Sequence, residues 1–126
     1  MSDFIFASHQ IDVPKVKRLI NSIYPSDEVF MFDFSGEWGT LIVCKGHYHG
    51  FYPIETNDHI FAVIGGPVLS FRDNDFLIHP SSNEGTMSIY QRWLDKNLIW
   101  DQDLDGPYVI VIIHKRSKQL EVITDM

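Results

Sequence analysis

Three aspartates at alternate positions of this chain suggest metal chemistry. The segment from Asp101 to Gly106, DQDLDG, spells the opening of an EF-hand calcium loop. Such a loop needs a bidentate Glu at its twelfth position, where this chain has Ile112. It also needs a helix after the loop, where Pro107 to Ile113 has the pattern of a strand. We therefore expect an acidic surface loop, with a calcium site as the less favoured alternative.

Two histidines form a second candidate. His47 and His49 would project from the same face of a strand and could together bind a metal. Two ligands do not complete a site, and folding would have to bring His59 or His79 to them. Polar histidines on a sheet face are the favoured interpretation, so no metal or cofactor is expected.

The only cysteine, Cys44, lies in an apolar segment, where a buried thiol is normally inert. A single cysteine excludes an internal disulfide framework, which fits a reducing compartment. The amino terminus has neither the basic region nor the apolar stretch of a signal peptide. The longest aliphatic run, Val109 to Ile113, is too short to span a bilayer. We expect a soluble, cytoplasmic protein.

Composition limits the possible partners. The chain has 126 residues, 44% of them hydrophobic, which suits a single domain over residues 1–126 with a core of its own. Ten Lys and Arg stand against seventeen Asp and Glu, a formal charge of -7. That balance repels phosphate backbones and disfavours nucleic-acid binding, whereas a basic protein would be attracted.

Two segments have apolar residues at helical spacing. Asp12 can cap the first helix, which would tolerate Pro14 in its first turn and end before Pro25. Thr86 can cap the second helix, and Arg72 to Asn83 before it has the composition of a loop.

The remaining apolar segments predict strands. A turn at Ser35 to Glu37 separates two of them, and Ile60 to Ile64 predicts a central strand. The strongest prediction is a buried hairpin from Gly106 to Asp125. The order of elements indicates a layered α+β fold. The other predicted strands are Phe4 to Ala7, Val29 to Phe34, Trp38 to Cys44 and His47 to His49.

Three segments, in this order, carry a family resemblance. Ile60 to Gly66 is an apolar strand ending in glycines, Glu84 to Tyr90 begins a helix, and Leu104 to Asp125 opens with LDGPYV and closes on Thr124-Asp125. This order resembles the amino-terminal glutaminase domain of asparagine synthetase-like proteins, the class II glutamine amidotransferases. The resemblance implies an αββα sandwich of the N-terminal-nucleophile (Ntn) hydrolase type, with mainly antiparallel sheets. That family fold is larger than this chain, which would be a compact variant or a piece of it.

The resemblance also implies where chemistry would sit. In the family a Cys directly after the initiator Met attacks the glutamine amide; here Ser2 stands there, followed by Asp3 in place of the family's Gly. The oxyanion-binding Asn-Gly pair is replaced by Gly65-Gly66, whose backbone amides could still donate. The family Asp that holds the substrate amine falls at Ser82. Glutamine hydrolysis is therefore expected to be lost.

The expected function is that of a catalytically degenerate amidotransferase-like domain that binds another protein. The partner would be an ATP-dependent amide-forming synthetase domain, or a basic toxin that the chain inhibits as an immunity protein. An open edge at Leu120 to Asp125 would also allow a homo-oligomer. The alternative is an Ntn-type amidohydrolase that uses Ser2 after removal of Met1. The expected binding residues are Asp73, Asp75, Ser82, Asp101, Asp103 and Asp105.

Overall fold

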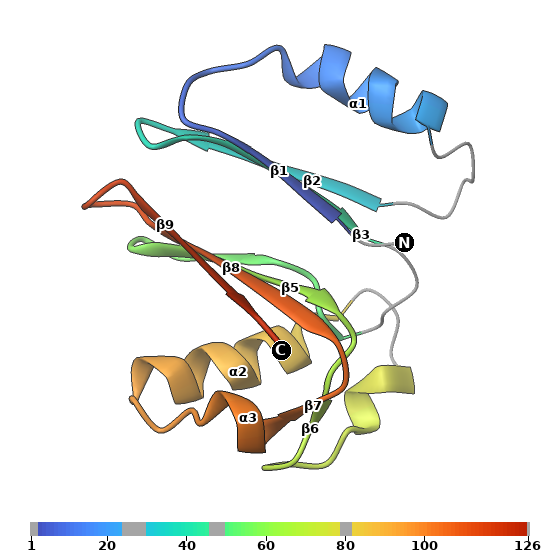
Figure 1. Cartoon of the computed structure of the whole chain (residues 1–126), viewed down its shortest axis with the longest axis vertical. Helices are drawn as coiled ribbons and strands as arrows, with labels where there is room; N and C mark the ends of the chain where they lie inside the picture. Colours follow the sequence, from blue (N-terminus) through green and yellow to red (C-terminus); the bar gives the residue numbers. More distant parts are fainter. Residues whose placement is uncertain (1–2, 24–29, 46–49, 79–81, 126) are drawn as a thin grey trace. The chain divides into compact units, whose positions relative to one another are not determined.

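A computed structural model describes residues 3–23, 30–45, 50–78 and 82–125 (Figure 1). The chain divides into two compact units, Met1–His47 and Tyr48–Met126. Each unit combines an antiparallel sheet with helical structure, so the α+β class is confirmed. No helix in the described ranges is long and apolar enough to cross a membrane.

The described residues of the first unit form a three-stranded sheet and one helix. Its strands β1 (Asp3–Ala7), β2 (Phe30–Gly36) and β3 (Gly39–Lys45) pair antiparallel in the order β1-β3-β2. Helix α1 (Val13–Ile23) packs on this sheet through a small core of Ile20, Ile42 and Cys44.

The predicted start of α1 is confirmed. The Asp12 side chain accepts a hydrogen bond from the backbone N–H of Lys15 at 3.1 Å, as an N-cap does. The turn between β2 and β3 comes later than Ser35 to Glu37, because β2 continues to Gly36 and β3 begins at Gly39. Gly39 has φ +127°, a conformation that favours glycine, so the reversal ends there.

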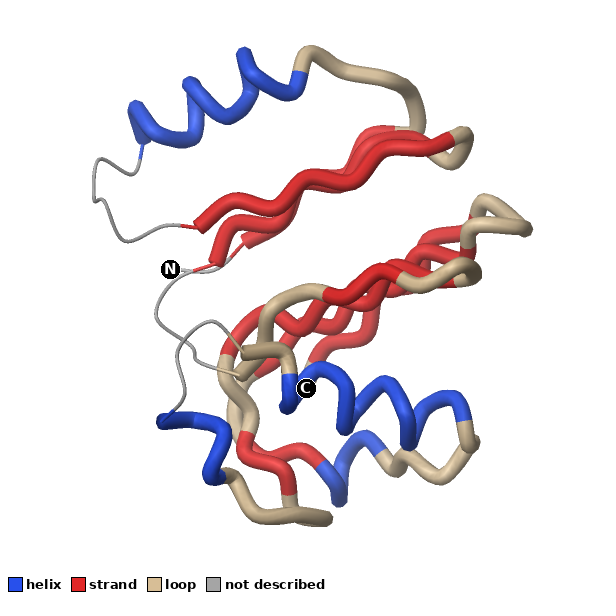
Figure 2. Tube along the Cα trace, turned by 180° about the vertical axis from the view of Figure 1, so that it is seen from behind, coloured by secondary structure: helices blue, strands red, loops and turns tan. Residues whose placement is uncertain are grey.

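The second unit is built on a four-stranded antiparallel sheet. Its strands are β4 (Ile54–Glu55), β5 (His59–Gly65), β8 (Tyr108–His114) and β9 (Gln119–Thr124), in the order β4-β5-β8-β9. Helix α2 (Glu84–Leu94) covers one face, with Ile89 and Tyr90 packed against Phe61 and Ile112. Figure 2 shows α2 and the short α3 (Trp100–Asp103) on the same side of this sheet. Two short strands, β6 (Val68–Leu69) and β7 (Leu104–Asp105), form a separate ribbon.

The predicted hairpin and central strand are confirmed, with one correction. β5 and β8 pair in register from His59 opposite His114 to Gly65 opposite Tyr108, and β8 continues into β9 through a short turn. β8 is buried, but β9 is mostly exposed, because it is the outermost strand and pairs, among the described residues, only with β8.

The start of α2 differs from the prediction. The helix begins at Glu84, and Thr86 is a buried residue of its first turn rather than its cap. The carbonyl oxygen of Gly50 accepts hydrogen bonds from the N–H groups of Gly85, at 2.8 Å, and Thr86, at 3.3 Å. A distant backbone group therefore supplies the cap. The predicted loop before α2 also contains a 3₁₀ helix, η1 (Asp75–Ile78).

Candidate functional site

The second unit contains a cavity of about 510 Å³ beside the carboxyl end of β9. We call it the acidic pocket. Two exposed carboxylates, Asp101 and Asp125, and two aromatic residues, Trp100 and Tyr108, contribute to its wall. The lining is completed by Leu104, Gly106, Pro107 and Thr124.

The β8–β9 pairing positions one of these carboxylates. The N–H of Tyr108 donates to the Asp125 side chain at 3.1 Å, and the N–H of Asp125 donates back to the Tyr108 carbonyl at 3.3 Å. Gly106, with φ +99°, turns the chain from β7 into β8. Helix α3 ends just before β7 and so brings Asp101 to the same cavity.

The potential in the acidic pocket is negative. Burial raises the pKa of the Tyr108 hydroxyl, and the charges of Asp125 and Asp101 raise it further. Among the described residues neither carboxylate forms an ion pair, and the Tyr108 hydroxyl donates to the carbonyl of Trp100 at 3.4 Å. A cavity with unneutralised carboxylates and aromatic rings is suited to a cation.

Asp103 does not belong to an acidic surface, which corrects the expectation for DQDLDG. The residue is only 7% exposed, and its carboxylate accepts hydrogen bonds from Arg92 at 3.0 and 3.3 Å and from the N–H of Ile99 at 2.8 Å. The segment is also not a loop, because it forms the end of α3 and the strand β7. Asp105 is exposed on β7 and is not part of the pocket wall.

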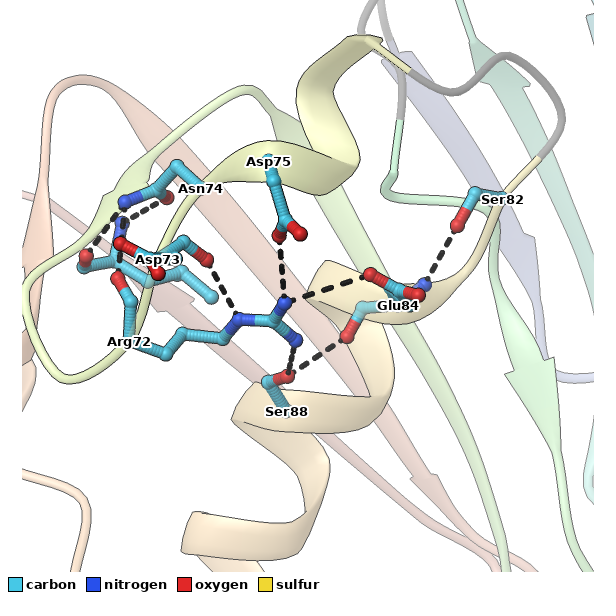
Figure 3. A network of polar contacts seen from close by, with 8 residues as sticks. Arg72, Asp73, Asn74, Asp75, Ser82, Glu84 and Ser88 are labelled. Carbon is cyan, nitrogen blue, oxygen red and sulfur yellow. Dashed lines mark hydrogen bonds and ion pairs between the residues drawn. The ribbon is translucent and has the colours of Figure 1, made fainter.

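The other predicted binding residues lie around Arg72 (Figure 3). The guanidinium of Arg72 pairs with Asp75 at 3.1 Å and with Glu84 at 3.4 Å, and donates to the backbone carbonyl of Asp73 at 2.7 Å. The Ser82 hydroxyl accepts a hydrogen bond from the N–H of Glu84 at 3.1 Å. These contacts connect the turn after β6 with the start of α2, and Arg72 neutralises part of the negative charge there.

Two further predictions concern the glycines and the cysteine. Gly65 has φ +99°, and an added Cβ would lie 2.6 Å from the Pro107 carbonyl oxygen, so the close pairing of β5 with β8 itself requires glycine. Burial and the neighbouring Asp3 charge raise the pKa of the Cys44 thiol, which disfavours the reactive thiolate. Ser2, His47, His49 and His79 lie outside the described residues.

A histidine pair that the sequence analysis did not predict lies at the other end of the sheet. His59 and His114 face each other across β5 and β8, with ring centroids 5.2 Å apart. Nδ1 of His59 lies 3.0 Å from the Tyr90 hydroxyl, and Nε2 of His114 lies 3.1 Å from the Glu121 carboxylate. Only the strand register brings the two rings together, so no spacing along the chain could have revealed them.

The described part of the chain holds no group of three or more His, Cys, Asp or Glu side chains arranged to bind a metal ion. Comparison with protein-family models, with curated proteins and with solved structures finds no match to this chain.

Proposed function

We propose that this chain is a catalytically degenerate glutamine-amidotransferase-like domain that acts by binding a basic protein. In this proposal the acidic pocket receives a Lys or Arg side chain of the partner. The supporting observation is the meeting of Asp101 and Asp125 with Trp100 and Tyr108 around one cavity.

The physical basis is complementarity of charge and shape. Carboxylates form charge-assisted hydrogen bonds with an ammonium or guanidinium group, and aromatic rings add a cation–π attraction of about 0.5–1 kcal/mol at exposed sites. The formal charge of -7 attracts a basic partner over a longer range and raises the association rate. The pocket therefore contributes specificity for a cationic side chain, and the net charge contributes a faster association with the partner.

Two classes of partner fit this chemistry. A synthetase domain that forms amides with ATP is the partner suggested by the family resemblance. A basic toxin, for which this chain is an acidic inhibitor or immunity protein, is suggested by the charge. Each would present a Lys or Arg side chain to the same pocket.

A charge-matched pair of variants tests the proposal. The partner is captured from the native source, identified and purified, and its Kd is measured by calorimetry at two salt concentrations. Asp125→Asn keeps the oxygen that accepts from the Tyr108 N–H but removes the pocket charge. Asp105→Asn removes the same charge from an exposed residue that does not line the pocket.

We expect Asp125→Asn to raise Kd by about tenfold, because one charge-assisted contact is lost. Asp105→Asn should change Kd by about twofold or less, through the weaker long-range attraction alone. Equal effects of the two variants, or a partner without net positive charge, would contradict the proposal.

A further inference from the structure

Strand β9 leaves one side of the four-stranded sheet open. Among the described residues β9 pairs only with β8, as the outermost strand of the order β4-β5-β8-β9 (Figure 1). Its register with β8 is continuous from Gln119 to Thr124, so no bulge twists the edge away. The strand also lacks Lys and Pro, two residues that commonly protect a sheet edge from pairing.

The hydrogen-bond pattern shows which backbone groups face outward. The N–H of Asp125 donates to the carbonyl of Tyr108, the next pair beyond Thr124 opposite Val109. Hydrogen-bonded and non-hydrogen-bonded pairs alternate along an antiparallel ladder. The N–H and C=O groups of Leu120, Val122 and Thr124 therefore point away from β8.

The side chains of the same residues are also accessible. Leu120 is 37% exposed and Val122 is 44% exposed, and both project from the same face of β9. The edge therefore offers an open row of donors and acceptors together with apolar side chains, the combination that strand addition uses.

The open edge is continuous with the acidic pocket. Thr124 ends β9, and both Thr124 and Asp125 line the pocket. Asp125 shares a sheet face with Ile123, which packs against the core under α2, and this is also the face of Tyr108. A residue added opposite Asp125 would therefore direct its side chain toward the pocket.

We infer that the edge of β9 accepts an extended segment of the basic partner as an additional antiparallel strand. A Lys or Arg at the amino-terminal end of that segment then enters the acidic pocket. This inference rests on the proposed function, because it uses the same pocket and the same class of partner.

Charge favours such a segment over a second copy of this chain. A copy also carries a formal charge of -7 and would bring the same carboxylates to the edge. Pairing two copies about Glu121 would place two glutamates directly opposite each other, which destabilises a sheet. A basic segment instead places a cation beside Asp125 and Asp101.

A short peptide tests the geometry. Acetyl-Arg-Val-Thr-Val-Thr-Val-amide, aligned antiparallel with Arg opposite Asp125, places its valines opposite Thr124, Val122 and Leu120. The N–H groups of the valines then bond to β9, and those of the threonines point away. The affinity of the full chain for this peptide is measured by fluorescence anisotropy, and amide exchange at Leu120, Val122 and Thr124 is followed by NMR.

We expect N-methylation of the central valine to weaken binding by about tenfold, because the hydrogen bond from its N–H to the Val122 carbonyl is lost. N-methylation of the first threonine should change Kd by about twofold or less. The amides of Leu120, Val122 and Thr124 should become protected from exchange only when the peptide is bound.

The outcomes separate this inference from the proposed function. If the two methylations change Kd equally and binding still depends on Asp125, strand addition is overturned but the role of the pocket stands. A clear valine effect without any loss on replacing Arg by uncharged citrulline would support strand addition and contradict the pocket's role. No binding at millimolar peptide, or a dimer of the chain alone with protected edge amides, would overturn the inference.

Discussion

Arg92 of α2 and Asp103 at the end of α3 form an ion pair with the guanidinium Nη2 3.0 Å from the carboxylate Oδ2. The same carboxylate accepts the N–H of Ile99, and the Arg92 guanidinium lies over the Phe71 ring at 4.4 Å. These contacts attach the short helix α3 to α2. The buried Asp103 therefore helps to hold its near neighbours Trp100 and Asp101 in the wall of the acidic pocket.

Replacing Asp103 should destabilise the fold. Asp103→Ala leaves the Arg92 charge and the Ile99 N–H without their partner, and we expect a loss of about 2–3 kcal/mol in the free energy of unfolding. Urea denaturation followed by circular dichroism measures the change. Asp105→Ala, at an exposed position on β7, should stay within about 0.5 kcal/mol. Similar losses in the two variants would mean that the ion pair does not hold α3.

The titration of Tyr108 should report the charge of the acidic pocket. Burial, Asp125 and Asp101 together raise the pKa of its hydroxyl. In an ultraviolet titration at alkaline pH, Tyr108 should ionise at a higher pH than an exposed tyrosine. Asp101→Asn should lower that raised pKa, because one of the neighbouring negative charges is removed. An unchanged titration curve would show that Asp101 does not act on the pocket.

Burial and the charge of His114 lower the pKa of His59, so folding should weaken in mild acid. The Asp58 charge opposes this shift. The Tyr90 hydroxyl bonds to the His59 ring, while Glu121 pairs with His114. His59 binds a proton more readily in the unfolded chain than in the folded one. The contribution of neutral His59 to stability is therefore complete above its ordinary pKa of about 6.5, and it is lost as the pH falls through its lowered pKa in the folded state.

The variant His59→Gln isolates this contribution. Between about pH 5 and 7, the free energy of unfolding should rise more steeply with pH in the wild type than in the variant. The difference between the two slopes should be less than about 1.4 kcal/mol per pH unit, which is the limit for one proton. His9→Gln, at an exposed position of the first unit, is the control for removing a histidine elsewhere in the chain. A wild-type slope in His59→Gln would refute the assignment.

Gly85 should resist replacement although it lies in a helix. An added Cβ would lie 2.6 Å from Cε1 of Phe51 and 2.9 Å from the carbonyl oxygen of Gly50. Gly-to-Ala changes in an open helix stabilise by about 1 kcal/mol, but overpacking here should destabilise by about 1–3 kcal/mol. Thermal unfolding of Gly85→Ala measures the result, with the exposed substitution Gln91→Ala as control. A higher Tm for Gly85→Ala would contradict the close packing.

Local sequence patterns were sufficient to predict the position of several helices and strands. Asp12 marks the start of α1 because a cap needs only a side-chain oxygen near the next N–H groups. Ile60 to Ile64 and Val109 to Ile113 are continuous apolar runs, which the structure uses as the neighbouring interior strands β5 and β8. The short polar turn between two β-rich runs likewise identified the β8–β9 hairpin. Each of these signals lies within a few residues of the element that it predicts.

The candidate site depended on the tertiary structure. The sequence does not distinguish the three aspartates of DQDLDG, yet their environments differ. Asp103 is buried against Arg92, Asp101 lines the pocket and Asp105 is exposed. The cap of α2 comes from Gly50, which lies 35 residues before Gly85 in the chain. Composition and periodicity determine which segments form strands and helices. Which distant side chains meet is decided by strand register and packing, because those bring together residues that no local pattern connects.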